Sequence, residues 1–119
     1  MESVDSTFDK ASRLLSTEDF AYLRKNSNVI TDRWLRIYYK PSRTNSEISR
    51  IGFSVTKKVG KANKRNICKR VIREFFRTSS YRKTGQDFMV VVSNRLYKSS
   101  KQPKEDLLHS LQNAFAKLQ

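Results

Sequence analysis

The feature that most constrains this chain is a run of positive charge between residues 57 and 77. The segment holds one acid, Glu74, and nine basic residues, so it carries +8 of the formal net charge of +14; the basic residues are Lys57, Lys58, Lys61, Lys64, Arg65, Lys69, Arg70, Arg73 and Arg77. Like charges at this density repel one another unless the fold spreads them over a surface or a polyanionic partner neutralises them. The segment therefore has to present its charges outward.

Residues 66–77 have the periodicity of an amphipathic helix. At 100° per residue, one half of the helix collects the apolar side chains Ile67, Cys68, Val71, Ile72, Phe75 and Phe76. The opposite half collects, within an arc of about 100°, the polar side chains Asn66, Lys69, Arg70, Arg73 and Arg77. A solvated face is the ordinary alternative, but here the charges are of one sign and continue through the preceding loop. A rigid row of cations fits a phosphate backbone, so the sequence predicts a nucleic-acid-binding protein.

Length and composition exclude several other classes. A chain of 119 residues fits one domain over residues 1–119, with an expected disordered lead-in at residues 1–12. It has no apolar run of about 18 residues and no signal-peptide pattern at its amino terminus. One cysteine excludes an internal disulfide, and one cysteine with one histidine argues against a zinc site. We therefore expect a cytoplasmic protein with no membrane association and no bound metal.

The remaining pattern predicts an α+β fold. Hydrophobic periodicity places helices at residues 16–25, 66–77 and 104–118 and strands at residues 29–30, 34–40, 50–56 and 88–92. Ser16 can cap the first helix, with Asp19 three residues later completing a capping-box pattern. The last strand is a continuous apolar run, which is typical of an interior strand covered on both faces. The chain is thus expected to form one sheet with helices packed on it.

The strand at residues 34–40 places two aromatic rings and two cations on one face. Alternate side chains of a strand point the same way, so this face would carry Trp34, Arg36, Tyr38 and Lys40. Unpaired bases stack on such rings with little regard to sequence, at about 1–3 kcal/mol per base. Two interpretations stay open: this face binds a single-stranded nucleic acid, or its rings pack beneath a helix.

The polypeptide shows no catalytic apparatus. Metal-free phosphodiester hydrolysis usually needs a general acid and a general base, and the one histidine, His109, is expected in a partly buried structural role in the last helix. The 11 acidic residues are scattered, whereas a two-metal site needs clustered carboxylates. Cys68 lies on the apolar helix face and is interpreted as structural. The sequence therefore predicts no catalytic residues and no metal site.

The central motif resembles the signature of the bacterial ribonuclease P protein subunit. The likeness is strongest at residues 53–62 and 64–73, where the pattern Arg-Asn-x-x-Lys-Arg-x-x-Arg falls on Arg65, Asn66, Lys69, Arg70 and Arg73. Flanking features agree, including residues 18–20, 34–38, 88–92 and an amphipathic helix near the carboxyl terminus. The resemblance covers about residues 12–118.

This resemblance implies a fold and a function. The fold would be a single-domain α/β sandwich of order α-β-β-β-α-β-α, with one mostly antiparallel central sheet and a left-handed crossover. The function would be that of ribonuclease P, which removes the 5′ leader from precursor tRNA to give the mature 5′ end. In that enzyme a large RNA that requires magnesium is the catalyst, and the protein binds no cofactor itself. The implied partners are this catalytic RNA and precursor tRNA, with no obligatory protein partner.

The resemblance also assigns two surfaces. The loop and helix over residues 57–77 would bind the catalytic RNA through Lys57, Lys58, Lys61, Lys64, Arg65, Asn66, Lys69, Arg70, Arg73 and Arg77. A cleft between the first helix and the sheet would guide the single-stranded leader through Phe20, Arg36, Tyr38 and Ser54. Trp34 joins this set from the strand face, and Arg24 joins because it stands where many relatives carry a second aromatic. The alternative is a non-enzymatic basic RNA-binding protein of ribosomal or chaperone type.

Overall fold

The structure, a computed structural model, describes residues 17–45 and 47–118. Along the chain the elements are α1 (Thr17–Leu23), β2 (Asn28–Thr31), β3 (Leu35–Pro41), β4 (Arg50–Ser54), α2 (Ala62–Arg77), the 3-10 helix η2 (Ser80–Lys83), β5 (Gln86–Val92), α3 (Leu96–Ser99) and α4 (Pro103–Ala116). This confirms the predicted order of the main helices and strands. The short helices η2 and α3 occupy segments where periodicity indicated none. The expected cap Ser16 and the lead-in at residues 1–12 lie outside the described residues.

The four strands form one mixed sheet in the order β2-β3-β5-β4. Strands β2 and β3 form an antiparallel hairpin, β3 and β5 are antiparallel, and β5 and β4 are parallel. The sheet is therefore mostly antiparallel, as predicted. Its register places Tyr38 opposite Met89, and Met89 opposite Gly52, in one row across the sheet. The next row on the same face joins Arg36, Val91 and Ser54.

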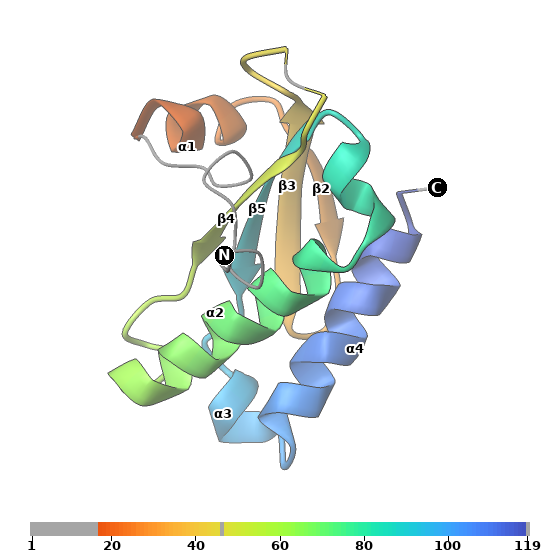
Figure 1. Cartoon of the computed structure of the whole chain (residues 1–119). Helices are drawn as coiled ribbons and strands as arrows, with labels where there is room; N and C mark the ends of the chain where they lie inside the picture. Colours follow the sequence, from red (N-terminus) through yellow and green to blue (C-terminus); the bar gives the residue numbers. More distant parts are fainter. Residues whose placement is uncertain (1–16, 46, 119) are drawn as a thin grey trace, which may run out of the picture.

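The parallel strands β4 and β5 are joined through α2 by a left-handed crossover. In Figure 1 both strands run downward, α2 crosses in front of the sheet, and β5 lies to the right of β4. About 98% of such connections have the opposite hand. The left-handed crossover implied by the resemblance is thus present, and it places α2 on one face of the sheet, beside α4.

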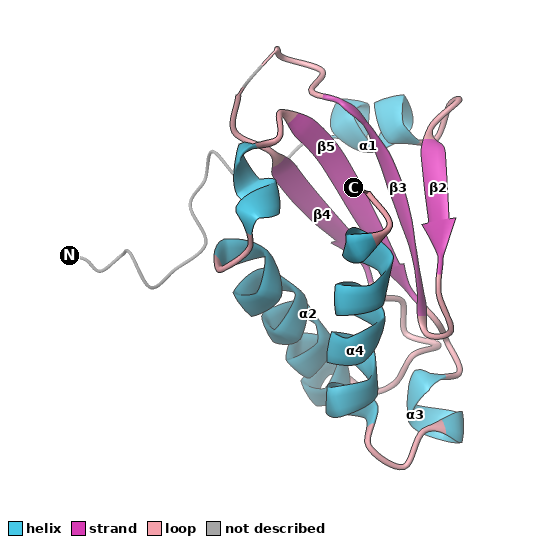
Figure 2. Ribbon diagram, turned by 90° about the vertical axis from the view of Figure 1, so that its right-hand side faces the viewer, coloured by secondary structure: helices cyan, strands magenta, loops and turns pink. Residues whose placement is uncertain are grey.

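The sheet separates two unequal layers of helices. Figure 2 shows α2 and α4 on one face and α1 on the other. The main core lies beneath α2 and α4, where the Phe88 ring centroid is 5.9 Å from that of Phe76 and 5.1 Å from that of Phe115. A smaller cluster built on Leu23 and Met89 joins α1 to the opposite face. Strand β5 is therefore an interior strand packed on both sides, as its apolar run predicted.

Candidate nucleic-acid interface

Helix α2 presents a basic face to solvent. Its residues Cys68, Val71, Ile72 and Phe76 are buried against the sheet and α4. The residues predicted to contact the catalytic RNA are all exposed or partly exposed. They are Lys57, Lys58, Lys61, Lys64, Arg65, Asn66, Lys69, Arg70, Arg73 and Arg77. Ile67, expected on the apolar half, is 36% exposed and lies at the margin of that half, next to the polar arc. The cationic row is thus held outward by a packed helix.

The amino-terminal end of α2 adds to this positive potential. The first turn contains no acidic residue, and the cap residue Lys61 makes no side-chain capping hydrogen bond. The unpaired N–H groups of a helix start carry partial positive charge and attract phosphate oxygens. The preceding loop is fixed by Val59, which is 2% exposed and whose N–H donates to the carbonyl of Thr56 at 3.0 Å. Exposed lysines therefore surround a helix end that itself favours anions.

Two cations of α2 rest on aromatic rings of neighbouring elements. The Nζ atom of Lys64 lies 5.2 Å from the ring centroid of Tyr97 in α3, and the Tyr97 hydroxyl donates to the carbonyl of Lys64 at 3.3 Å. The guanidinium carbon of Arg73 lies 5.4 Å from the ring centroid of Phe53 in β4. Such contacts restrict where a long basic side chain can point, so part of the face is preorganised.

Beneath this face, Cys68 and Tyr97 form a polar contact inside the core. Cys68 is a free thiol that is 1% exposed, so it packs in the core where the sequence analysis interpreted it as structural. Burial raises the pKa of the Cys68 thiol. Burial, together with the neighbouring Cys68 thiol, raises the pKa of Tyr97 to about 12. Burial therefore favours the neutral form of both groups.

The raised pKa of Tyr97 predicts that the folded protein loses stability at alkaline pH. Tyr97 would ionise near pH 10 in the unfolded chain, but only at about 12 in the folded protein. Its contribution to stability is therefore complete below about pH 10 and is lost as the pH rises toward 12. We expect Tyr97→Phe to flatten this decline in the free energy of unfolding, measured by urea titration at several pH values. An equally steep decline in the variant would contradict this assignment.

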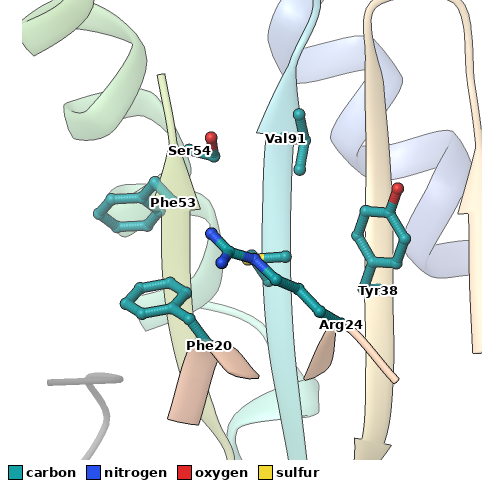
Figure 3. Close-up of a pocket in the computed structure, with 7 residues that line it drawn as sticks. Phe20, Arg24, Tyr38, Phe53, Ser54 and Val91 are labelled. Atoms are coloured by element: carbon teal, nitrogen blue, oxygen red, sulfur yellow. The ribbon is translucent and has the colours of Figure 1, made fainter. Parts of the chain in front are cut away.

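On the opposite face of the sheet, a groove of about 450 Å³ lies between α1 and the strands. It is lined by Phe20, Arg24, Tyr38, Phe53, Ser54, Met89 and Val91. Figure 3 shows the rings of Phe20 and Phe53 on the β4 side and that of Tyr38 on the β3 side, with Arg24 reaching across β5 between them. Aromatic rings and one guanidinium group thus surround an open hollow, which is a suitable environment for an unpaired base and its phosphate.

Four of the six residues predicted to contact the leader line this groove: Phe20, Arg24, Tyr38 and Ser54. A fifth, Arg36, lies one row along the same face, and its Nη1 atom donates to the Tyr38 hydroxyl at 3.3 Å. Arg36 also lines an adjoining hollow of about 340 Å³, which shares Val91 with the groove. The sheet register therefore brings together side chains that the chain carries far apart.

Trp34 does not belong to this surface, and its expected stacking role is wrong. It precedes β3 rather than lying in it, it is 7% exposed, and it packs in the main core. The turn that contains it is closed by the N–H of Asp32, which donates to the carbonyl of Leu35 at 2.9 Å. The alternation that groups Arg36 with Tyr38 therefore does not extend back to Trp34.

Lys40 lies on the same face as Arg36 and Tyr38, but its Nζ atom donates to the Tyr22 and Lys25 carbonyls at 2.9 and 2.6 Å.

Three residues that line the groove were missed: Phe53, Met89 and Val91. Met89 and Val91 lie in a run of apolar residues, in which no polar alternation marks the two faces. Phe53 alternates in sequence with Ile51 and Val55, which are buried, so the strand pattern by itself places Phe53 on the core side. A sheet register was needed to identify the first two, and the position of β4 at the edge of the sheet was needed to identify the third.

A buried ionic cluster fixes α1 on the sheet. Arg50 of β4 donates to both carboxylate oxygens of Asp87 at 3.0 and 2.9 Å, and its Nη2 donates to Asp19 of α1 at 3.0 Å. Arg43 donates from Nε to Asp19 at 2.9 Å and from its backbone N–H to Asp87 at 3.1 Å. Asp19 and Asp87 are 2% and 0% exposed. Hydrogen bonding to Asp87 raises the pKa of Arg50. Because Phe20 follows Asp19, the cluster also positions the Phe20 ring.

The described residues offer few groups for hydrolytic chemistry. Within residues 17–45 and 47–118, no cluster of three or more His, Cys, Asp or Glu side chains is placed to hold a metal ion. His109 is exposed on α4, so its expected partly buried position is wrong. Helix α4 covers the face of the sheet opposite to the groove, so His109 does not belong to the groove (Figure 2).

Among the described residues 17–45 and 47–118, every helix is too short or too polar to cross a membrane.

Comparison with known proteins identifies the family. The family model for ribonuclease P matches residues 8–119. The chain belongs to the ribonuclease P protein family. Among curated ribonuclease P protein components, that of Buchnera aphidicola is 37% identical over 92 residues, which cover 76% of this chain and 79% of the relative. That of Caldanaerobacter subterraneus is 29% identical over 111 residues, covering 92% of this chain and 88% of the relative.

A solved structure shows the same architecture. The ribonuclease P protein of Staphylococcus aureus superimposes with a TM-score of 0.79 at 25% sequence identity, over 92% of this chain and 97% of that one. The α+β fold with one mixed sheet is thus the fold of this ribonuclease P family.

Proposed function

We propose that this protein is the protein subunit of a ribonucleoprotein enzyme that removes the 5′ leader from precursor tRNA by endonucleolytic cleavage in the cytoplasm. The observation that carries the proposal is the presence of two different surfaces suited to RNA, one basic and one aromatic, on opposite faces of one sheet. The basic face of α2 lies on one side, and the groove beneath α1 lies on the other. Such an arrangement suits a protein that holds a catalytic RNA and a substrate RNA at the same time.

The α2 face has the properties needed to bind the catalytic RNA. Its cations are exposed or half-exposed and lie on a helix that is packed against the core. A large folded RNA presents closely spaced phosphates, and neutralising them releases condensed counterions. The helix start at Ala62 adds unpaired N–H groups to the same surface. Contacts from these cations to phosphates can position a folded RNA without reading its base sequence.

The groove has the properties needed to bind the single-stranded leader. Bases of an unpaired strand can stack on Phe20 and Tyr38, and Arg24 and Arg36 are placed to meet phosphates. Stacking tolerates any base, which suits leaders of different sequence. A paired RNA offers its bases poorly to aromatic side chains, so the groove favours a single strand.

In this proposal, hydrolysis is carried out by the catalytic RNA with its magnesium ions, and the protein contributes binding energy. Mature tRNA has no leader, so contacts in the groove favour precursor over product. Fixed cations on α2 replace part of the diffuse ion atmosphere around the folded RNA, which lowers the magnesium concentration that the enzyme requires. The protein thus increases the affinity for substrates and the range of substrates accepted.

The decisive test is reconstitution with the catalytic RNA encoded by the same genome. We expect the mixture to cleave precursor tRNA at the mature 5′ end at a magnesium concentration at which the RNA alone is inactive. Binding of RNA without cleavage in the mixture would indicate the alternative, a non-enzymatic RNA-binding protein. Cleavage by the protein without RNA would indicate a nuclease with its own catalytic residues.

The groove makes a separate prediction. Tyr38→Ala removes a half-exposed ring from the floor of the groove without opening the main core. We expect the reconstituted enzyme to bind precursor tRNA about 5- to 100-fold less tightly, as loss of one stacked base predicts, with no change for mature tRNA. Equilibrium binding to both RNAs measures this. Ile67→Ala, which trims an exposed side chain on α2, is the control. An equal loss for mature tRNA would show that Tyr38 does not contact the leader.

A further inference from the structure

Phe53 contributes to the main core on one face of the sheet and to the groove on the other. The sheet register pairs it with Val90, so its side chain starts on the core face, and it packs against the main core. The same side chain lines the groove on the other face. This is possible because β4 is an edge strand, with no further strand beyond it to enclose the ring. Figure 3 shows the Phe53 ring beside β4, on the same side of the groove as the Phe20 ring.

The ring of Phe53 also contacts the basic face of α2. The guanidinium carbon of Arg73 lies 5.4 Å from the ring centroid, and Arg73 is exposed. Arg73 belongs to the pattern that the resemblance assigns to the catalytic RNA. A planar guanidinium can remain on a ring while its N–H groups point toward a phosphate. The residue proposed to bind one RNA is thus seated on a residue that lines the site proposed for the other.

We propose that Phe53 is a leader-contacting residue and that Arg73 is its positioning residue, so that binding at the α2 face strengthens binding in the groove. The proposal rests on the proposed function and names the side chains that link its two surfaces. A phosphate held by Arg73 fixes the guanidinium over the ring, and the fixed ring forms a ready wall for a leader base. Less ordering is then needed when the leader binds, and by linkage the leader strengthens the grip of Arg73 in return.

The experiment uses reconstituted holoenzyme at protein concentrations that saturate the catalytic RNA. Binding is measured for two precursors that differ only in leader length, about five nucleotides and one nucleotide, and the ratio of their dissociation constants is the readout. Phe53→Leu keeps an apolar side chain in the core but removes the ring. Phe75→Leu is the matched control, because Phe75 is also half-buried and packs on Phe115 of the same core, with ring centroids 5.2 Å apart.

We expect Phe53→Leu to weaken binding of the long-leader precursor by about 5- to 20-fold, in line with the loss of one stacked base, and to leave the short-leader precursor unchanged. Phe75→Leu should leave the ratio at the value of the unsubstituted protein. A ratio that Phe53→Leu does not change would overturn the proposal while leaving cleavage, and with it the proposed function, intact. Failure of the unsubstituted holoenzyme to assemble or cleave would contradict both the proposal about Phe53 and the proposed function.

Arg73→Lys tests the positioning step, because it keeps the charge but removes the planar group that lies on the ring. We expect it to weaken long-leader binding by about 2- to 5-fold, the usual size of an exposed cation–π contact, and to add no further loss when Phe53 is already leucine. Equal weakening for both leader lengths, or an additive loss in the double variant, would show that Arg73 acts on phosphate alone. Since Arg73 is exposed, this arm does not depend on how well Phe53→Leu folds.

Discussion

Replacement of Arg50 by alanine is expected to lower the free energy of unfolding by about 3–5 kcal/mol, because it removes the guanidinium that bridges two buried carboxylates and with it much of their compensating positive charge. Arg50 bridges Asp19 of α1 and Asp87 of β5, and these aspartates are 2% and 0% exposed. For a domain of this size, the melting temperature should fall by roughly 10–20 °C. Urea unfolding and calorimetry measure both quantities. The same change releases α1, so leader binding should weaken more than binding of the catalytic RNA.

Arg36→Ala provides the control for this effect. Arg36 is an exposed arginine on the same face of the sheet, so its loss changes the net charge equally without removing a partner of a buried acid. Its effect on the free energy of unfolding should stay within about 0.5 kcal/mol, as for most surface substitutions. If Arg50→Ala costs no more than Arg36→Ala, the ionic cluster does not hold α1 on the sheet.

The second large effect is expected on assembly with the catalytic RNA. Lys69→Ala combined with Arg70→Ala removes two cations from the middle of the α2 face, where Arg70 is exposed and Lys69 is partly exposed. If about six side chains meet phosphates, the logarithm of the association constant should fall against the logarithm of salt with a slope of roughly −4 to −5. The double variant should make this slope shallower by about 2 and weaken assembly by about 10- to 100-fold near physiological salt.

Lys104→Ala combined with Lys117→Ala is the charge-matched control. These exposed lysines lie on α4 and just after it, so the net charge changes equally while the α2 face stays intact. We expect little change in the salt dependence of assembly, and circular dichroism should show both double variants to be folded. Equal weakening in the two pairs would mean that the overall charge, rather than the α2 surface, determines RNA binding.

Periodicity predicted most elements because each long helix or strand here buries a regular face. In α2, the residues placed on the apolar half include Cys68, Ile72 and Phe76, which are 1%, 0% and 0% exposed. Strand β5 is packed on both faces, and an uninterrupted apolar run is what such a strand requires. The location of the basic helix could therefore be predicted from local pattern alone.

Local pattern failed where an element ends or lies at an edge. Trp34 continues the alternation of β3 in sequence, but the strand begins one residue later and the ring turns into the core. Phe53 obeys the alternation, yet its ring reaches past the edge of β4 into the groove. The position of neither side chain follows from its residue type. Each position is determined by the elements that the fold places beside it.

The ionic cluster escaped prediction for a different reason. Arg50 is separated from Asp19 by 31 residues and from Asp87 by 37. A charged residue in a strand ordinarily indicates an exposed position, and nothing near Arg50 in sequence marks it as half-buried. Only the register of β4 against β5, together with the docking of α1, brings the three side chains together.

The crossover from β4 through α2 to β5 has a consequence for how the molecule is made. Strand β5 forms the middle of the groove floor, yet it is synthesised after α2. On the ribosome, the cationic segment therefore emerges before Arg50 meets Asp87 and before α1 can pack on Met89 of β5. A nascent chain can attract polyanions before it has any means of recognising a leader.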